Sequence, residues 1–124
     1  DGHTIWVCTS GNGMIGLDMR TARQTHITTQ QGLPSNYIKS VLLADNNLWI
    51  GTDNGICCYN LTNKQIRTFG TQQNLANVSF SVNAACQLPD GRLAFGIPIG
   101  LIQFLLWGVF IFRIYAYRAV PFGK

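Results

Sequence analysis

The sequence is poor in charge and contains no glutamate. Charged residues make up 11% of its 124 residues, against about 25% in typical globular chains, which excludes disorder driven by high charge. All five acidic residues are aspartates. Because glutamate favours helices and is depleted in strands, its absence favours a β structure.

The cysteines and histidines lack the spacing of a metal site. No C-x-x-C pair occurs, and neither His3 nor His26 stands at ligand spacing from a cysteine, so we expect no metal and no other cofactor. Cys57 and Cys58 are adjacent on a predicted strand and should point to opposite faces. We interpret all four cysteines as small hydrophobic core residues, although the sequence does not decide their disulfide state. They are Cys8, Cys57, Cys58 and Cys86.

The net charge of +4 comes from the C-terminal end. Arg113, Arg118 and Lys124 lie in the last dozen residues without an acidic neighbour, and removing these three of the nine basic residues leaves six against five acidic ones. A nucleic-acid-binding protein carries a broad basic patch instead. We therefore expect no nucleic-acid partner.

What the sequence does contain is a phrase that occurs three times. It reads LWIGTDNGI at residues 48–56, IWVCTSGNGM at residues 5–14 and, in a degenerate copy, LAFGIPIGL at residues 93–101. Trp6 and Trp49 are 43 positions apart, and Ala94 takes the tryptophan's place 45 positions later. Repeats of about 40–45 residues are typical of the four-stranded blade of a β-propeller.

The chain is too short for a closed propeller, which needs about four to eight blades. We predict an all-β, partial β-propeller of under three blades. Residues 1–30 supply the last three strands of one blade, residues 31–70 a complete blade, and residues 71–104 the start of the next. The predicted strands are Thr4–Thr9, Met14–Asp18, Gln24–Thr29, Tyr37–Ala44, Leu48–Thr52, Ile56–Asn60, Gln65–Phe69, Ser81–Leu88, Arg92–Gly96 and Leu101–Phe104.

The repeated residues have structural roles in this interpretation. Trp6 and Trp49 are large apolar side chains on a sheet face, where neighbouring blades pack together. Gly51 and Gly96 fall where a side chain would block a close backbone approach. A phosphate-binding interpretation of the GTxxG phrase is disfavoured, because neither a lysine nor a helix pattern follows it.

The hairpin that follows each phrase has its own pattern. Thr9 and Thr52 stand at the hairpin entrance, where a hydroxyl can bond turn amides. Gly55 can adopt the positive φ that three-residue hairpin loops require, and Gly100 recurs near the same place in the third copy. No catalytic group is predicted among these residues.

The linker GLPSNYI at residues 32–38, followed by the phrase at residues 48–56, resembles the two-component regulator propeller repeat. Such repeats form the periplasmic sensor region of hybrid two-component histidine kinases, mostly from Bacteroidetes. The resemblance covers residues 4–104. It implies a place on the periplasmic face of a bacterial inner membrane and a role in sensing oligosaccharides for signal transduction. No kinase motif is in the chain, so we expect no enzymatic activity from it.

The ligand-binding candidates lie on predicted connections, where binding residues concentrate. They are Asn36, Tyr37, Gln72 and Gln73, chosen because sugar recognition favours aromatic faces and planar amides. The alternatives are a structural or protein-interaction propeller, or a fragment of a propeller enzyme. Besides an oligosaccharide, we expect further blades of a parent chain, or self-association through unpaired strand edges, as partners.

The C-terminal tail, residues 105–124, has two open interpretations. Residues 93–112 form a run of 20 uncharged residues followed by Arg113, which suits a membrane span and membrane contact. Residues 93–104 also align with blade strands, and one stretch cannot be both. Either residues 105–124 are a non-native end, or Leu101–Tyr117 is an apolar helix.

Overall fold

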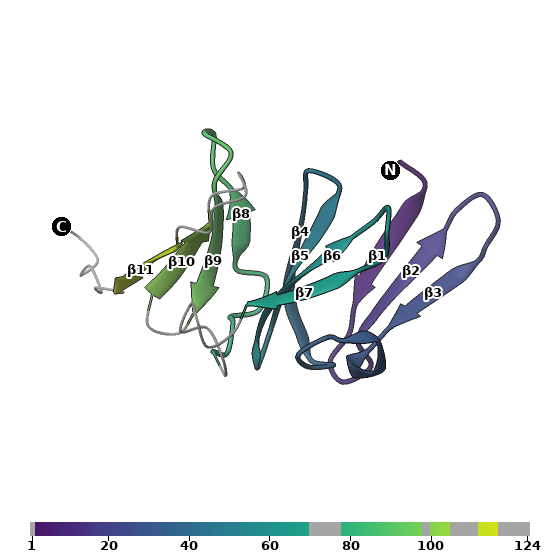
Figure 1. Cartoon of the computed structure of the whole chain (residues 1–124), viewed down its shortest axis with the longest axis horizontal. Coiled ribbons are helices and arrows are strands. Elements are labelled where there is room, and N and C mark those ends of the chain that lie inside the picture. Colours follow the sequence, from purple (N-terminus) through teal and green to yellow (C-terminus); the bar gives the residue numbers. More distant parts are fainter. Residues whose placement is uncertain (1, 70–77, 98–99, 105–111, 117–124) are drawn as a thin grey trace, which may run out of the picture.

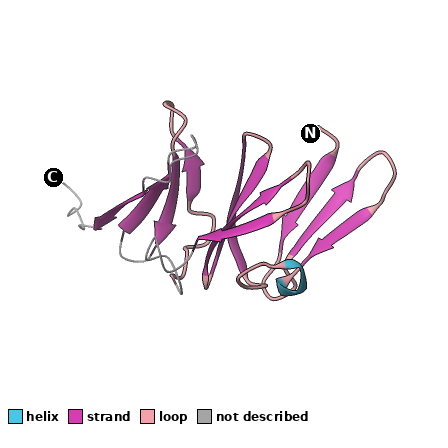
Figure 2. Cartoon of the chain, in the orientation of Figure 1, coloured by secondary structure: helices cyan, strands magenta, loops and turns pink. Residues whose placement is uncertain are grey.

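The computed structural model describes residues 2–69, 78–97, 100–104 and 112–116, and the regular secondary structure in these ranges is strand, apart from one short helix (Figure 2). Three antiparallel sheets lie side by side in chain order (Figure 1). The predicted all-β class is confirmed.

The first sheet has three strands and the other two have four each. The first contains β1 (Thr4–Cys8), β2 (Met14–Asp18) and β3 (Gln24–Ile27). The second contains β4 (Ile38–Ala44), β5 (Asn47–Thr52), β6 (Gly55–Asn60) and β7 (Ile66–Phe69). The third contains β8 (Ala85–Gln87), β9 (Leu93–Ile97), β10 (Gly100–Phe104) and β11 (Phe112–Ala116).

Two strands, β3 and β8, are shorter than the sequence pattern predicts by two residues or more. β3 stops at Ile27 because the side chain of Thr28 caps the short 3-10 helix η1 (Thr29–Gln31). β8 covers three residues, not the predicted Ser81–Leu88, because Asn83 adopts a φ of 56°. The Asn83 amide then donates to the Lys39 carbonyl of β4 instead of joining its own sheet.

The end of the third sheet settles part of the question about the tail. Gly100–Phe104 and Phe112–Ala116 pair as antiparallel strands, so the helix interpretation of Leu101–Tyr117 is wrong for these residues. Both strands contain β-branched and aromatic residues, among them Ile102, Phe112 and Tyr115, which favour extended structure. Within the described residues, no helix is long and apolar enough to cross a membrane.

The core divides into two clusters, one at each contact between sheets. We call the contact of the first and second sheets the first junction, and that of the second and third sheets the second junction. The first junction buries Met14, Ile27, Leu33, Ile38, Leu48, Ile50, Cys57 and Tyr59. The second buries Ala44, Trp49, Ile56, Phe69, Phe80, Leu93 and Phe95.

The second sheet therefore has two buried faces that alternate along each strand. On β5, Leu48 and Ile50 belong to the first junction while Trp49 belongs to the second. Cys57 lies in the first junction and Cys58 packs against the second, so they point to opposite faces. Cys8 and Cys86 are exposed, which corrects the expectation that all four cysteines are buried.

Candidate functional site

The repeated phrase forms the same hydrogen-bonded loop in the first and second sheets. The Thr52 hydroxyl donates to the Gly55 carbonyl over 2.7 Å and accepts from the Asn54 amide over 3.0 Å. The Thr9 hydroxyl donates to the Gly13 carbonyl over 2.6 Å and accepts from the Asn12 amide over 3.0 Å. The threonine thus closes the hairpin, although the first loop is one residue longer.

Both glycine positions in the phrase lie against other atoms. A Cβ at Gly51 would lie 2.8 Å from the Ser40 Oγ and 3.2 Å from the Phe80 side chain, and one at Gly96 would lie 2.7 Å from the Ala84 Cβ. Such distances leave no room for a side chain without a shift of the neighbours.

The tryptophans pack at the two junctions. Trp6 meets Tyr59 edge-on, with ring centroids 6.0 Å apart. Trp49 stacks on Phe69 at 5.6 Å, with planes only 8° apart. Each tryptophan belongs to the junction between its own sheet and the next one in the sequence, so both side chains help to pack neighbouring sheets. Gly100 lies at the start of β10.

The linker between the first two sheets is tied down by Thr28 and Asn36. Thr28 and Gln31 form a capping box around η1, and the chain leaves it through Gly32 at a φ of 116°. The Asn36 Oδ1 accepts from the Thr29 amide over 2.9 Å. The Asn36 carbonyl accepts from Gly11 and Gly13. Asn36 therefore joins the linker to the first sheet.

A shallow hollow opens where this linker meets the β1–β2 loop. Its volume is about 390 Å³, and its lining is mainly polar. His26 reaches across it and donates from Nε2 to the Asn12 carbonyl over 2.6 Å. The lining residues are Gly11, Asn12, His26, Thr28, Thr29, Gln30, Gln31 and Asn36. We call this the linker hollow.

Tyr37 stands beside the linker hollow. Its side chain is 50% exposed, and its ring atoms lie 3.4–3.5 Å from the place of a Cβ on Gly11. The structure thus brings Asn36 and Tyr37 together with His26 and Asn12, which the sequence analysis did not select. The other two candidates, Gln72 and Gln73, lie outside the described residues.

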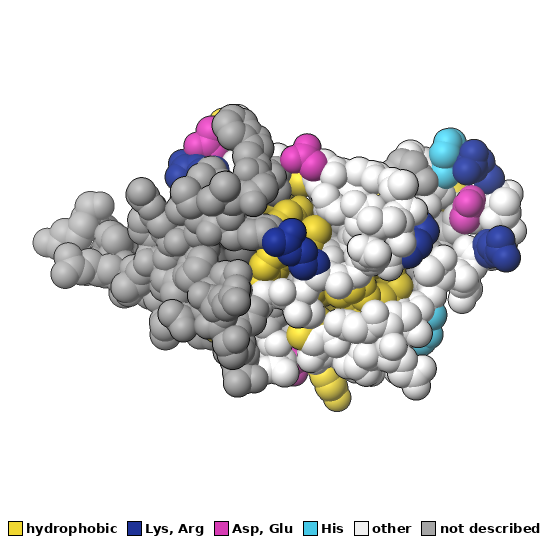
Figure 3. Space-filling view, viewed as in Figure 1, with side chains coloured by type: hydrophobic (Ala, Val, Ile, Leu, Met, Phe, Trp, Pro, Cys, Tyr) yellow, Lys and Arg dark blue, Asp and Glu magenta, His cyan; other side chains and the backbone are white. Residues whose placement is uncertain are grey.

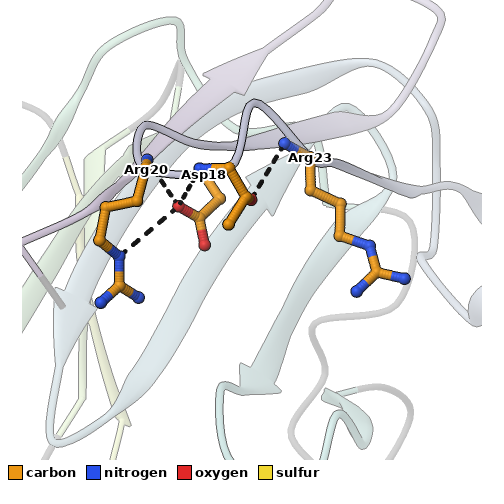
Figure 4. Close-up of polar contacts among 4 residues, drawn as sticks. Asp18, Arg20 and Arg23 are labelled. Atoms are coloured by element: carbon orange, nitrogen blue, oxygen red, sulfur yellow. Dashed lines mark hydrogen bonds and ion pairs between the residues drawn. The ribbon is translucent and has the colours of Figure 1, made fainter.

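The opposite end of the first sheet carries a charged turn (Figure 4). The Asp18 Oδ1 accepts from the Arg20 amide over 2.8 Å and from the Thr21 amide over 3.3 Å, and the Arg23 amide donates to the Thr21 hydroxyl. The Arg20 amide is the main cause that lowers the pKa of Asp18. The carboxylate therefore stabilises its own turn.

The β6–β7 turn repeats this arrangement without the charge. The Asn60 Oδ1 accepts from the Thr62 and Asn63 amides, and Lys64 takes a φ of 64°. Asn60 follows Asp18 by 42 residues, which is one repeat. The shared geometry identifies Asp18 as a turn residue.

Charge is thinly distributed over the rest of the described surface. Figure 3 shows the Lys, Arg and Asp side chains in ones and twos, with apolar side chains visible between the sheets. Among the described residues, no group of three His, Cys, Asp or Glu residues could hold a metal ion. The linker hollow is therefore the best candidate site in this part of the chain.

Comparisons with known proteins agree with this architecture. Residues 32–54 match the model of the two component regulator propeller family. No curated protein matches the chain by sequence. The match includes the linker and most of the repeated phrase.

Three solved structures from B. thetaiotaomicron are similar over most of the chain. The extracellular domain of the putative hybrid two component system BT3049 has a TM-score of 0.71 at 25% identity, over 90% of this chain and 15% of its own. The extracellular domain of the putative hybrid two component system BT4673 has a TM-score of 0.76 at 23% identity, over 94% of this chain and 16% of its own. A second structure of the BT4673 extracellular domain, described as that of a putative one component system, has a TM-score of 0.68 at 25% identity, over 83% of this chain and 14% of its own.

The three sheets are therefore part of a β-propeller. The chain carries a two-component regulator propeller repeat, and its fold is that of a portion of the extracellular domains of hybrid two-component systems. It spans about 15% of the length of the BT3049 domain. The location of these neighbours is consistent with an extracytoplasmic place for this chain.

Proposed function

We propose that the chain is part of a propeller that recognises an oligosaccharide in the periplasm for a hybrid two-component sensor. Its mechanism is recognition and not catalysis. The observation that carries the proposal is the likeness to extracellular domains of hybrid two-component systems, joined to the family match at residues 32–54.

The chemistry of the linker hollow supports a sugar ligand. Tyr37 offers an exposed aromatic face, and the hollow is lined by the amide-bearing residues Asn12, Gln30 and Gln31 and by His26. An aromatic face and planar hydrogen-bonding groups suit the apolar and hydroxyl surfaces of a sugar ring. These groups come from the first sheet and from the linker that leads to the second sheet, so a ligand there would be sensitive to the placement of the two blades.

The test is titration calorimetry of the purified chain with oligosaccharides prepared from a panel of polysaccharides. We expect one class to bind, and Tyr37→Ala to weaken that binding about tenfold, equivalent to about 1.4 kcal/mol. Met19→Ala is the matched control, because Met19 is also exposed but lies in the turn at the other end of the first sheet.

The possible results separate the ligand from the site. If no oligosaccharide binds, the proposed ligand class is wrong. If one binds and Tyr37→Ala binds it equally well, the linker hollow is not the site.

A further inference from the structure

The backbone orients two side-chain amides of the linker hollow. The Gln31 Oε1 accepts from the Thr28 amide over 2.7 Å, and the Asn36 Oδ1 accepts from the Thr29 amide over 2.9 Å. A backbone N–H can only donate, so these bonds assign the oxygen and the nitrogen of each side-chain amide. Among the described residues, neither amide nitrogen has a hydrogen-bond partner. Both nitrogens therefore remain as donors for a ligand.

His26 adds an acceptor to these donors. Its Nε2 lies 2.6 Å from the Asn12 carbonyl oxygen, which can only accept, so Nε2 carries the proton of this bond. In a neutral imidazole the other ring nitrogen is then an acceptor. Nδ1 is therefore the ring atom that remains for a ligand, and it needs a donor such as a hydroxyl group.

The linker hollow carries no fixed charge. None of the described residues that line it is Asp, Glu, Lys or Arg. A carboxylate or sulfate group would therefore lose water without meeting a cation, and it has no proton to donate to Nδ1. A hydroxyl group both donates and accepts, so it can match the histidine and the amides alike.

The size of the linker hollow limits how much of a ligand it can hold. Its volume of about 390 Å³ is toward the lower end of the range of about 300–1,000 Å³ that is typical of small-molecule sites. The hollow therefore suits a short segment of an oligosaccharide, beside the exposed ring of Tyr37.

We infer that the linker hollow selects neutral oligosaccharides over acidic ones and that His26 determines this specificity, which rests on the function proposed above. One sugar hydroxyl donates to the His26 Nδ1, while other sugar oxygens accept from the amide nitrogens of Gln31 and Asn36. Uronic and sulfated sugars are disfavoured, because they bring a charge that no lining residue balances.

The test is titration calorimetry of the purified chain with matched pairs of oligosaccharides, at about pH 8, where a histidine side chain is ordinarily neutral. One member of each pair is a neutral oligosaccharide of mannan, cellulose or starch. The other is the same oligosaccharide with each primary hydroxyl oxidised to a carboxylate. We expect the neutral member of one pair to bind about tenfold more tightly than its oxidised partner, because its hydroxyl groups need no cation.

His26→Gln tests the hydrogen bond to Nδ1. Glutamine can keep a donor for the Asn12 carbonyl, but it places no acceptor at the position of Nδ1. The variant should therefore bind the neutral oligosaccharide about three- to tenfold more weakly, as expected for one lost hydrogen bond. His3→Gln is the matched control, because His3 is also exposed but does not line the hollow, and its binding should be unchanged.

The contrary results are distinguishable. If no member of any pair binds, the proposed function and this inference are both wrong. If an oxidised oligosaccharide binds as tightly as its neutral partner, oligosaccharide recognition stands and the selection of neutral sugars is wrong. If His26→Gln binds the neutral oligosaccharide as tightly as the original chain does, His26 does not determine the specificity.

Discussion

The two junctions share a backbone arrangement and differ in their side chains. The Ile38 amide donates to the Thr9 carbonyl over 3.0 Å at the first junction, and the Phe80 amide donates to the Thr52 carbonyl over 2.9 Å at the second. Gly13 and Gly55 likewise each donate to the following linker. The repeat is therefore conserved in the contacts that fix one sheet against the next.

The two junctions are packed by different kinds of side chain. Trp6 lies over Gly16, where a Cβ would be 2.7 Å from the ring, and apart from Tyr59 the buried residues of the first junction are not aromatic. Trp49 pairs with Cys58 and stacks on Phe69, while Phe80 and Phe95 meet edge-on at 5.9 Å. The second junction thus depends more on aromatic side chains.

The largest expected effect is the loss of Trp49. It is 4% exposed, so Trp49→Ala should cost about 3–5 kcal/mol of the free energy of unfolding, from lost burial and the cavity left behind. Trp6→Ala should cost less, because Trp6 is only half-buried. Urea unfolding of the two variants measures the difference. Equal losses would show that the two junctions are energetically equivalent despite their packing.

Filling the glycine position of the second junction should have the next largest effect. Gly51→Ala places a Cβ 2.8 Å from the Ser40 Oγ, and overpacking of this kind costs about 1–3 kcal/mol. Ser40→Ala removes that oxygen, so the cost of Gly51→Ala should be smaller in a Ser40→Ala background. A double-mutant cycle by urea unfolding measures this coupling. Additive effects would mean that Phe80, at 3.2 Å, is the main obstacle.

The hairpin threonines test whether burial strengthens the same hydrogen bonds. Thr52 is fully buried, so Thr52→Val should cost about 1–2 kcal/mol, because the buried Gly55 carbonyl loses its donor. Thr9 is only part-buried, and Thr9→Val should cost less than about 1 kcal/mol, because water can replace the lost partner. Thermal unfolding of both variants compares them, and a larger loss from Thr9→Val would contradict the argument.

The sequence predicts the strands of the first two sheets closely because turn residues fix their ends. The Asp45-Asn46 turn, for instance, has both φ values positive, as asparagine and aspartate permit. The short β8 was not predictable, because it results from a bond between Asn83 and the neighbouring sheet.

The site was less predictable than the fold. Asn36 and Tyr37 could be selected from their place on a connection, but the linker hollow needs His26 and Asn12 from the first sheet. Only the folded chain brings these residues to the linker. The capping-box pattern of Thr28 and Gln31 was the one local signal for the structure of that linker.

The last expected effect is a loss of stability that appears only in alkaline solution. Burial raises the pKa of Cys57 to about 12 from the ordinary 9.0, with a further contribution from Cys58. The unfolded chain therefore releases this proton first as the pH rises. The stabilisation is complete below about pH 9 and is lost progressively toward about pH 12.

Cys57→Ala isolates this contribution within the first junction. The variant should lose packing stability at every pH but should show a shallower decline of the urea midpoint between about pH 8 and about pH 11, measured under reducing conditions. Cys86→Ala is the matched control, because Cys86 is exposed, and it should decline as steeply as the original chain. Parallel declines of all three proteins would mean that Cys57 reaches solvent as readily in the folded as in the unfolded chain, so that the first junction does not seal this face of β6.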